Sequence, residues 1–504
     1  MRFDNALAAR LAKAALARGG GAAAALALGE AEFFSGRHAE AEEALAGAVG
    51  LCRNDEERAA IANARAYNLG MLIGDAPAAA TVIAEALLII AEPGPRFRLL
   101  ARRALNNVYS GDVSSALADS EELVASGDDD AAARGATVRS VALAALGRGD
   151  QAVEAAHRGL EAVRGTSQNP EGQYVGSILG HAASGCLVEA EADARIAYDS
   201  CVRTGNVEGA ATFALLLGWV LVEKGDCAGA CRMFREGAAA SRDLRDVPNL
   251  RFCLGGLALG EGMSGNAEPA AGALAELADL PAHWMVLLDP DLIERGRAWA
   301  RVAAGEISAA CTLLRESADH AARQQWLTAE AKLRHDLVRL GEARIEVSRL
   351  VELAGLVEGQ LVPAFAQHAE AVAQDSSQGL DEVAERFASL HANLLAAEAF
   401  TEAGVGYQRQ GLKRLATTSS RRAGELRGIE GIGHTPALAE PSSMSPLTKR
   451  EREVAALASS GLSSREIADR LYVSVRTVDN QLQRVYAKLG ITSRDSLGEA
   501  LGDS

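Results

Sequence analysis

The sequence predicts an all-α protein, in which a long array of helical hairpins precedes a small four-helix domain. Three observations lead to this prediction. Ala supplies 103 of the 504 residues and aromatic residues only 4%; Ala is the best helix former, whereas sheets favour β-branched and aromatic side chains. A glycine recurs at nearly constant spacing as far as Gly411. Helix-start motifs crowd into the last 58 residues.

Charge is unevenly distributed along the chain. The net charge is −16, but from Ser445 onward nine Lys and Arg face eight Asp and Glu, a net charge of +1. The rest carries 42 basic against 59 acidic residues, a net charge of −17. An acidic body of this kind does not lie on nucleic acid, because phosphates repel it. Any binding to nucleic acid is therefore expected at the C-terminal end.

The cysteines and the apolar runs bear on location. Seven Cys, an odd number, are scattered over the chain, which favours reduced thiols and a cytoplasmic protein. Cys227 and Cys231 stand four residues apart, as metal ligands on a helix could, but no His is near and we expect two small buried residues. The longest apolar run, residues 210–222, is short of the ~20 residues that span a bilayer, so no membrane partner is expected.

Each recurring glycine separates two helical runs, as Gly225 separates 211–222 from 228–238. We expect the glycine to end the first helix in the left-handed conformation. An Asp, Asn or Glu that follows then caps the second helix. An Ala five residues after most of these glycines is placed where two helices approach closely. The glycines are Gly36, Gly74, Gly111, Gly149, Gly185, Gly225, Gly265, Gly305, Gly341, Gly379 and Gly411.

The array of residues 1–427 resembles tetratricopeptide repeats, although its spacing of 32 to 40 residues is longer and more variable than their usual 34. Such hairpins stack into a superhelix with a concave surface. We expect this surface to bind a protein or a small ligand; a rigid spacer is the alternative. The aromatic residues in the apolar runs are expected in the core rather than at a ligand site. They include Tyr67, Tyr109, Trp219, Trp299 and Trp326.

Signals of catalysis are missing from the sequence. It contains no P-loop, no His-Glu-x-x-His and no Gly-x-Ser-x-Gly motif. We therefore expect no enzymatic activity, no catalytic residue, no metal and no cofactor.

The array is expected to end near Arg427. Gly, Pro and Ser dominate residues 428–446, which predicts a flexible linker. Beyond it, residues 447–504 form a separate domain. Capping boxes at Thr448–Glu451 and Ser463–Glu466 predict helices that run to about Ser459 and Arg470. Ser474 and Ser493 cap two further predicted helices, 475–489 and 494–501.

The apolar residues of this domain fall at helical spacing and predict one small core. Two of its helices, joined by a tight turn, make a helix-turn-helix whose second helix would enter the major groove of DNA. The predicted core residues are Val454, Leu457, Ile467, Ala468, Leu471, Val473, Val478, Leu482, Val485 and Leu489.

Residues 447–454, 461–468, 471–474, 477–478 and 485–490 together resemble the LuxR-type DNA-binding domain. The resemblance extends from Leu447 to Leu501. With the helical body, the chain is similar to the C-terminal half of large ATP-binding (MalT-like) LuxR regulators, without their ATPase domain. Two interpretations stay open: a shortened regulator, or part of a longer one.

The resemblance implies roles for individual residues. Asp479, Asn480 and Gln483 would face base edges. Leu497, Ala500 and Leu501 would pair two copies across a two-fold axis, although Leu497 also fits the core. The residues that would contact the DNA backbone are Thr448, Ser464, Arg465, Ser474, Arg476, Thr477, Arg484 and Lys488.

The sequence departs from the family at two positions of the recognition helix. The family usually has Lys after Thr-Val and His two residues further on, where this chain has Asp479 and Gln481. Asp can accept a hydrogen bond from cytosine N4, but it also repels phosphates. We expect an altered sequence preference and weaker non-specific binding.

The resemblance implies a bacterial transcriptional regulator, whose repeat domain senses an effector and gates a DNA-binding dimer. The implied partners are double-stranded DNA, a second copy of the chain on DNA, and a small-molecule inducer or protein on the repeats; RNA polymerase is a further candidate. The alternative is a protein-interaction scaffold with a vestigial DNA-binding domain.

Overall fold

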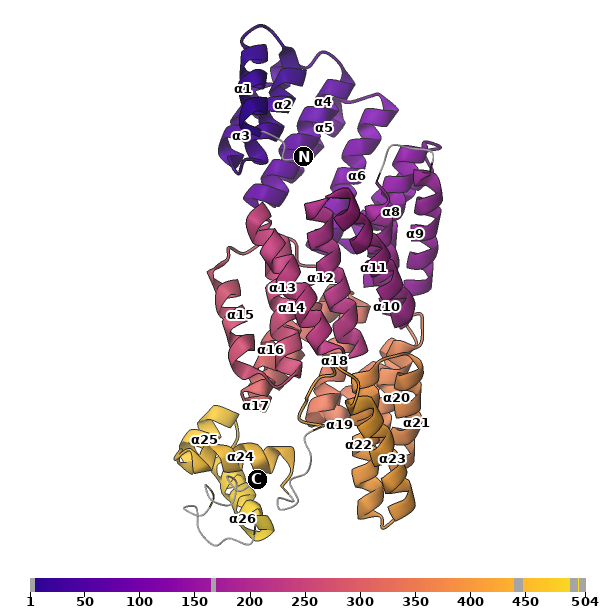
Figure 1. Cartoon of the computed structure of the whole chain (residues 1–504), viewed down its shortest axis with the longest axis vertical. Coiled ribbons are helices and arrows are strands. Elements are labelled where there is room, and N and C mark those ends of the chain that lie inside the picture. Colours follow the sequence, from indigo (N-terminus) through magenta and orange to yellow (C-terminus); the bar gives the residue numbers. More distant parts are fainter. Residues whose placement is uncertain (1–4, 165–168, 439–446, 490–496, 498–504) are drawn as a thin grey trace.

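The protein is seen in a computed structural model that describes residues 5–164, 169–438, 447–489 and 497. Almost every described element is a helix, and the β pairing among these residues is limited to an isolated bridge between Asp226 and Ile432. The predicted all-α fold is confirmed. The helices form an elongated body with the N-terminal helices at one end and the C-terminal helices at the other (Figure 1).

Eleven consecutive hairpins follow α1 (Asn5–Leu16) within the described residues. Their first helices are α2 (Gly21–Phe33), α4 (Asp55–Tyr67), α6 (Pro93–Ser110), α8 (Asp129–Ala145), α10 (Glu171–Ser184), α12 (Val207–Lys224), α14 (Val247–Met263), α16 (Arg295–Ala303), α18 (Leu327–Leu337), α20 (Leu361–Ala373) and α22 (Asn393–Arg409). Their second helices are α3 (His38–Gly47), α5 (Ala76–Ile89), α7 (Val113–Val124), α9 (Gly149–Val163), α11 (Leu187–Thr204), α13 (Cys227–Leu244), α15 (Ala267–Asp279), α17 (Ile307–Arg323), α19 (Ala343–Ala354), α21 (Ser377–Ser389) and α23 (Lys413–Arg427). Short helical turns supplement them at η1 (Val49–Leu51), η2 (Asn68–Ile73), η3 (Asp289–Glu294) and η4 (Val338–Glu342).

Nine of the eleven predicted glycines take the left-handed conformation between the helices of a hairpin. Gly225, for example, has φ of +89°, and the next residue, Asp226, caps α13 by accepting a hydrogen bond from the Gly229 amide. The prediction was wrong for Gly149 and Gly379, which lie inside the first turns of α9 and α21. Gly147 and Asp375 occupy the left-handed positions there, with φ of +74° and +50°.

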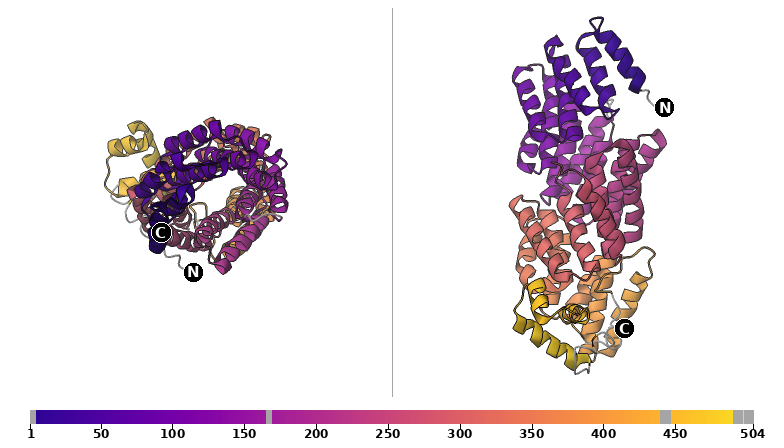
Figure 2. Two further views of the ribbon diagram at one scale, coloured as in Figure 1. Left: turned by 90° about the horizontal axis from the view of Figure 1, so that it is seen from above. Right: turned by 90° about the vertical axis from the view of Figure 1, so that its left-hand side faces the viewer.

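The hairpins wind around a common axis (Figure 2), so that hairpins far apart in sequence come into contact. The Trp284 indole donates to the carbonyl of Gly70, 214 residues away, at 2.6 Å. The Trp326 indole donates to the carbonyl of Gly111, 215 residues away, at 3.3 Å. Successive turns of the superhelix therefore pack directly on each other, in one case through a hairpin glycine, Gly111.

The main hydrophobic core runs through the superhelix from Ala104 to Leu438, and smaller clusters serve the hairpins before it. Trp219, Trp299 and Trp326 are buried in the main core, as predicted. Cys227 and Cys231 are also buried, as expected of small core residues. None of the described helices combines the length and the apolarity needed to cross a bilayer.

Part of the predicted flexible linker is packed against this body. Ile432 and Leu438 are buried in the main core, and the Thr435 hydroxyl donates to the buried carboxylate of Glu398. The Ala228 amide donates to the Gly431 carbonyl at 3.1 Å. Residues 428–438 therefore belong to the folded body, because their apolar side chains pack into the main core and their backbone bonds Ala228 and Met263 in the middle of the array. Residues 439–446 lie outside the described residues.

Candidate nucleic-acid interface

Three short helices beyond the repeats are positioned by their own sequence signals. They are α24 (Lys449–Ser459), α25 (Ser464–Leu471) and α26 (Val475–Leu489). Thr448 and Glu451 form the predicted capping box of α24: the Thr448 amide donates to the Glu451 carboxylate at 2.7 Å, and the Glu451 amide donates to the Thr448 hydroxyl at 3.2 Å. Ser463 and Glu466 form the same box at α25. Local sequence thus fixes where both helices begin.

These helices share a small core of their own. Val454, Ile467, Val478 and Val485 are each fully buried in it. Of the other predicted core residues, Ala468, Leu471 and Leu482 are buried, and Leu457 and Val473 pack at its edge. The side chain of Leu489 lies outside the described residues. Because this core is separate from that of the superhelix, the three helices form a distinct unit.

A tight turn joins α25 to α26. Tyr472 adopts the left-handed conformation, with φ of +53°, and its side chain is 90% exposed. The Val473 amide donates to the Ala468 carbonyl at 3.0 Å, which closes the turn. Ser474 then accepts from the Thr477 amide at 3.1 Å and so caps α26. The geometry is that of a helix-turn-helix.

The two faces of α26 differ sharply. Val478, Leu482 and Val485 point into the core, whereas Asp479 and Asn480 are exposed on the outer face. Both side chains are accessible to a partner, and their contact with base edges stays a prediction. The side chain of the third predicted base-reading residue, Gln483, lies outside the described residues.

The predicted backbone contacts gather around the helix starts. Thr448, Ser474, Arg476 and Thr477 are exposed at the N-termini of α24 and α26. Ser464 and Arg465 open α25, with Ser464 half-buried and Arg465 exposed. Helix N-termini favour anions, so this placement suits phosphate groups. The side chains of Arg484 and Lys488 lie outside the described residues.

The predicted dimer face is described at one position only. Leu497 is fully buried in the core of the domain, which is the second of the two places that the sequence allowed for it. It is therefore not an exposed contact in this structure. Ala500 and Leu501, and the rest of the predicted fourth helix, lie outside the described residues.

The helix-turn-helix unit also contacts the repeat body, which the sequence did not predict. The buried Glu453 carboxylate lies at the N-terminus of α17, where the Ser308 hydroxyl donates to it at 3.2 Å. Arg450 bonds both Glu453 and the Ser308 hydroxyl. Lys449 Nζ donates to the Arg339 carbonyl at 2.9 Å. We call Lys449, Arg450, Glu453 and Arg470 with their partners Glu306, Ser308 and Arg339 the docking contact.

The comparisons with known proteins agree with this geometry. The family description "Bacterial regulatory proteins, luxR family" matches residues 445–498. HTH-type transcriptional regulators of Mycobacterium bovis and Mycobacterium tuberculosis are 57% identical over 51 residues, which is 10% of this chain and 6% of theirs. The DNA-binding transcriptional activator DevR/DosR of Mycobacterium tuberculosis is 43% identical over 51 residues, 24% of its length. The chain thus matches only a small part of these relatives.

Two solved structures overlap the repeat body. A Rap protein complexed with Competence and Sporulation Factor has 12% sequence identity and a TM-score of 0.47, and the match covers 72% of this chain and 99% of that one. The Cut9–Hcn1 assembly has 12% identity and a TM-score of 0.37, and the match covers 84% of this chain and 91% of that one.

The capping boxes, the turn at Tyr472, the exposed face of α26 and the family match all concern one segment. Residues 445–498 match the luxR family of bacterial regulatory proteins, and within the described part of this segment residues 447–489 form its helix-turn-helix.

Proposed function

We propose that the chain is a transcriptional regulator that binds double-stranded DNA as a homodimer through α25 and α26. The observation that carries this proposal is the exposed outer face of α26, with Asp479 and Asn480, within a luxR-family domain. An Asn side chain can bond adenine bidentately, and an Asp can accept from cytosine. Two copies are needed because a domain with a net charge of +1 binds a single half-site weakly.

Footprinting of the full chain on the promoter region of its own gene tests this proposal, at two salt concentrations. We expect a discrete protected site with two-fold symmetry. Asn480→Ala should weaken binding by about tenfold or more, because a bidentate base contact is worth about 1–3 kcal/mol. Ser460→Ala is the matched control: Ser460 is exposed at the end of α24, and among the described residues its hydroxyl bonds only the Leu457 carbonyl.

Binding that is salt-sensitive, unlocalised and unchanged by Asn480→Ala would contradict sequence-specific regulation. It would instead support the scaffold alternative, in which Asp479 marks a recognition helix that no longer reads DNA. Asp479 is exposed where the family usually places a cation, and its negative charge repels DNA phosphates.

We further infer that the repeat body senses an effector and gates DNA binding through the docking contact. The contact ties α24 and α25 to α17 and η4 of the body. The body carries a net charge of −17, so DNA that approaches a docked domain also approaches an acidic surface. An effector that favours a body with the contact broken would free the domain.

A further inference from the structure

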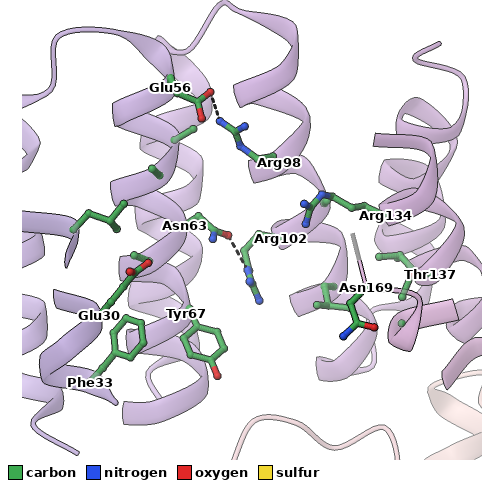
Figure 3. Close-up of a pocket in the computed structure, with 18 of the residues that line it drawn as sticks. Glu30, Phe33, Glu56, Asn63, Tyr67, Arg98, Arg102, Arg134, Thr137 and Asn169 are labelled. Carbon is green, nitrogen blue, oxygen red and sulfur yellow. Dashed lines mark hydrogen bonds and ion pairs between the residues drawn. The ribbon is translucent and has the colours of Figure 1, made fainter. Parts of the chain in front are cut away.

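The first hairpins line a cavity of about 630 Å³ that is partly open to solvent. Its walls come from α2, α4, α6, α8 and the start of α10. Figure 3 shows Arg102 near its middle, with Asn63 and Tyr67 on one side and Thr137 and Asn169 on the other. This volume is in the range of small-molecule sites, which are typically about 300–1,000 Å³.

Arg102 differs from the other arginines of its helix. Arg96, Arg98 and Arg103 of α6 each pair with a carboxylate, from Glu122, Glu56 and Asp119. Arg102 has no carboxylate partner among the described residues. Its Nε donates to the Asn63 amide oxygen at 3.0 Å, and its guanidinium lies 5.5 Å from the centre of the Tyr67 ring.

The guanidinium of Arg102, at the cavity and without a carboxylate partner among the described residues, is suited to bind an anion. A guanidinium has five N–H donors and one of the five is used by Asn63. Withdrawal from water lowers the pKa of Arg102, and the neighbouring charge of Arg134 acts in the same direction. Arg102 is half-buried, and a charge that is partly withdrawn from water without a counter-charge is costly. The planar fork matches a carboxylate through two parallel hydrogen bonds.

The side-chain oxygen of Gln173, a second polar group at the cavity, has no hydrogen-bond donor among the described residues. Gln173 is 2% exposed and lines the cavity. Its Nε2 donates to the Ala133 carbonyl at 3.0 Å, but its Oε1 is buried without a hydrogen-bond partner among the described residues. A buried acceptor of this kind costs free energy until a donor reaches it. Because this oxygen is closed off from the cavity, a ligand donor reaches it only if the Gln173 side chain turns, whereas Arg102 lacks a carboxylate acceptor among the described residues as it stands.

The other residues that line the cavity further define the chemical class of the ligand. Phe33 and Tyr67 lie with ring centres 5.8 Å apart and offer an aromatic surface. The sequence analysis expected Tyr67 in the core, but its side chain is only partly buried and lines the cavity. Glu30 faces the cavity from α2, and partial loss of water raises the pKa of its carboxyl.

We propose that this cavity binds a small ligand with a free carboxylate, a neighbouring amide N–H and an apolar side group, as at the C-terminus of a short peptide or in an N-acyl amino acid. The carboxylate pairs with Arg102, the N–H bonds Gln173, and the apolar group lies on Phe33 and Tyr67. A peptide would also bring a cationic amino end, for which Glu30 is the matching group. This assignment deepens the sensing role proposed above and rests on it for its consequence, but not for binding itself.

Calorimetric titration of the full chain without DNA tests the proposal. The probes are Ala-Ala-Phe, its C-terminal amide, N-acetylphenylalanine and inorganic phosphate. We expect Ala-Ala-Phe to bind at least about tenfold more tightly than its amide, because the amide loses the charge-assisted bidentate pair. If N-acetylphenylalanine binds, the ligand belongs to the acylated amino acids. If it does not bind, the ligand is a peptide. The carboxylate assignment stands in both cases.

Variants show whether Arg102 is responsible. Arg102→Gln should abolish the preference for the acid over the amide, and Arg102→Lys, which keeps the charge but not the fork, should reduce it. Arg96→Gln is the matched control, since it removes an equal charge from the same helix outside the cavity. Circular dichroism confirms folding of each variant.

Three outcomes would overturn the proposal: equal binding of acid and amide, phosphate binding as tight as that of the acid, or an equal loss in Arg96→Gln. None of these depends on DNA, so they are distinct from a failed footprint.

Discussion

At the scale of single residues, the buried charges of the body differ in how fully they are compensated. Arg295 is bonded by Glu223 at 2.7 Å and by Asp336 at 2.8 Å. Although burial alone would raise it, the pKa of Asp336 lies below its usual range because Arg295 and Arg339 stabilise the carboxylate. Asp289 is the opposite case. Burial raises its pKa to about 7, and the nearest cation, Arg251, is 3.9 Å away.

This difference predicts how stability depends on pH. The pKa of Asp289 is about 7 in the folded chain and near 3.8 in the unfolded chain. The folded protein therefore holds an extra proton between these values, and stability falls as the pH rises from 4 to 7. Each pKa unit is worth about 1.4 kcal/mol. Asp289→Asn should raise the melting temperature at pH 8 and leave it nearly unchanged at pH 4.

Melting curves at pH 4, 6 and 8 measure this effect. Asp243→Asn is the control, because Asp243 is an exposed Asp of the same body. A melting temperature of Asp289→Asn that falls at pH 8 would show that the ionised carboxylate stabilises the fold through Arg251, contrary to the prediction.

At the scale of elements, a hairpin glycine can serve two purposes. It allows the left-handed turn between two helices, and it allows close contact with the next turn of the superhelix; the sequence pattern does not distinguish them. Gly225 and Gly411 both have positive φ, +89° and +75°. A Cβ on Gly225 would come within 2.7 Å of the backbone nitrogen of Leu394, in the next turn of the superhelix, whereas a Cβ on Gly411 would meet nothing within 4 Å. Only Gly225 is thus required for contact between turns as well as for its own hairpin.

Substitution by Ala separates the two purposes. Gly411→Ala should cost about 1–2 kcal/mol, the strain of a left-handed non-glycine residue. Gly225→Ala should cost more than twice as much, because the backbone of α22 must also move away. Urea denaturation followed by Trp fluorescence measures both, since Trp219 and Trp299 are buried in the main core. Equal losses would show that the contact between turns adds nothing.

The elements also show what local sequence can predict. Both capping boxes and the bounds of α26 were predicted closely, because a cap depends on residues three positions apart. Gly149 falls in phase with the other recurring glycines, but Gly147, two residues before it, takes the left-handed conformation. The Gly147 amide bonds the Ala144 carbonyl and ends α8, while Gly149 lies where Ser184 leaves no room for a Cβ.

At the scale of the whole molecule, the important contacts join residues far apart in sequence. A chain of buried ion pairs runs from Glu223 through Arg295, Asp336 and Arg339 to Glu398. Lys449 of the helix-turn-helix domain donates to the carbonyl of Arg339, 110 residues away. No local sequence pattern encodes pairs between such distant residues. The series of buried ion pairs, the docking contact and the Arg102 cavity could therefore not be predicted from the sequence.

The docking contact meets this series of ion pairs at Arg339, so a rearrangement inside the body can reach the DNA-binding domain through that residue. If docking restrains the domain, breaking it from the body side should tighten DNA binding. Glu306→Arg with Ser308→Arg removes the partner of Arg470 and sets cations against Arg450. The exposed Arg470 pair is worth at most about 1 kcal/mol and the buried Glu453 contact about 1.5–3 kcal/mol. We therefore expect about tenfold tighter binding or more.

A matched pair of substitutions separates docking from charge. Glu306 and Ser308 are the N-cap and second residue of α17; Asn266 and Glu268 hold the same positions in α15, and among the described residues no hydrogen bond or ion pair joins them to α24, α25 or α26. Asn266→Arg with Glu268→Arg changes the charge by the same +3. Fluorescence anisotropy on the footprinted site, at equal salt, should show tighter binding for the α17 pair alone. An equal gain in both proteins would mean that the acidic body acts only through its overall charge, and the docking contact would then have no part in gating.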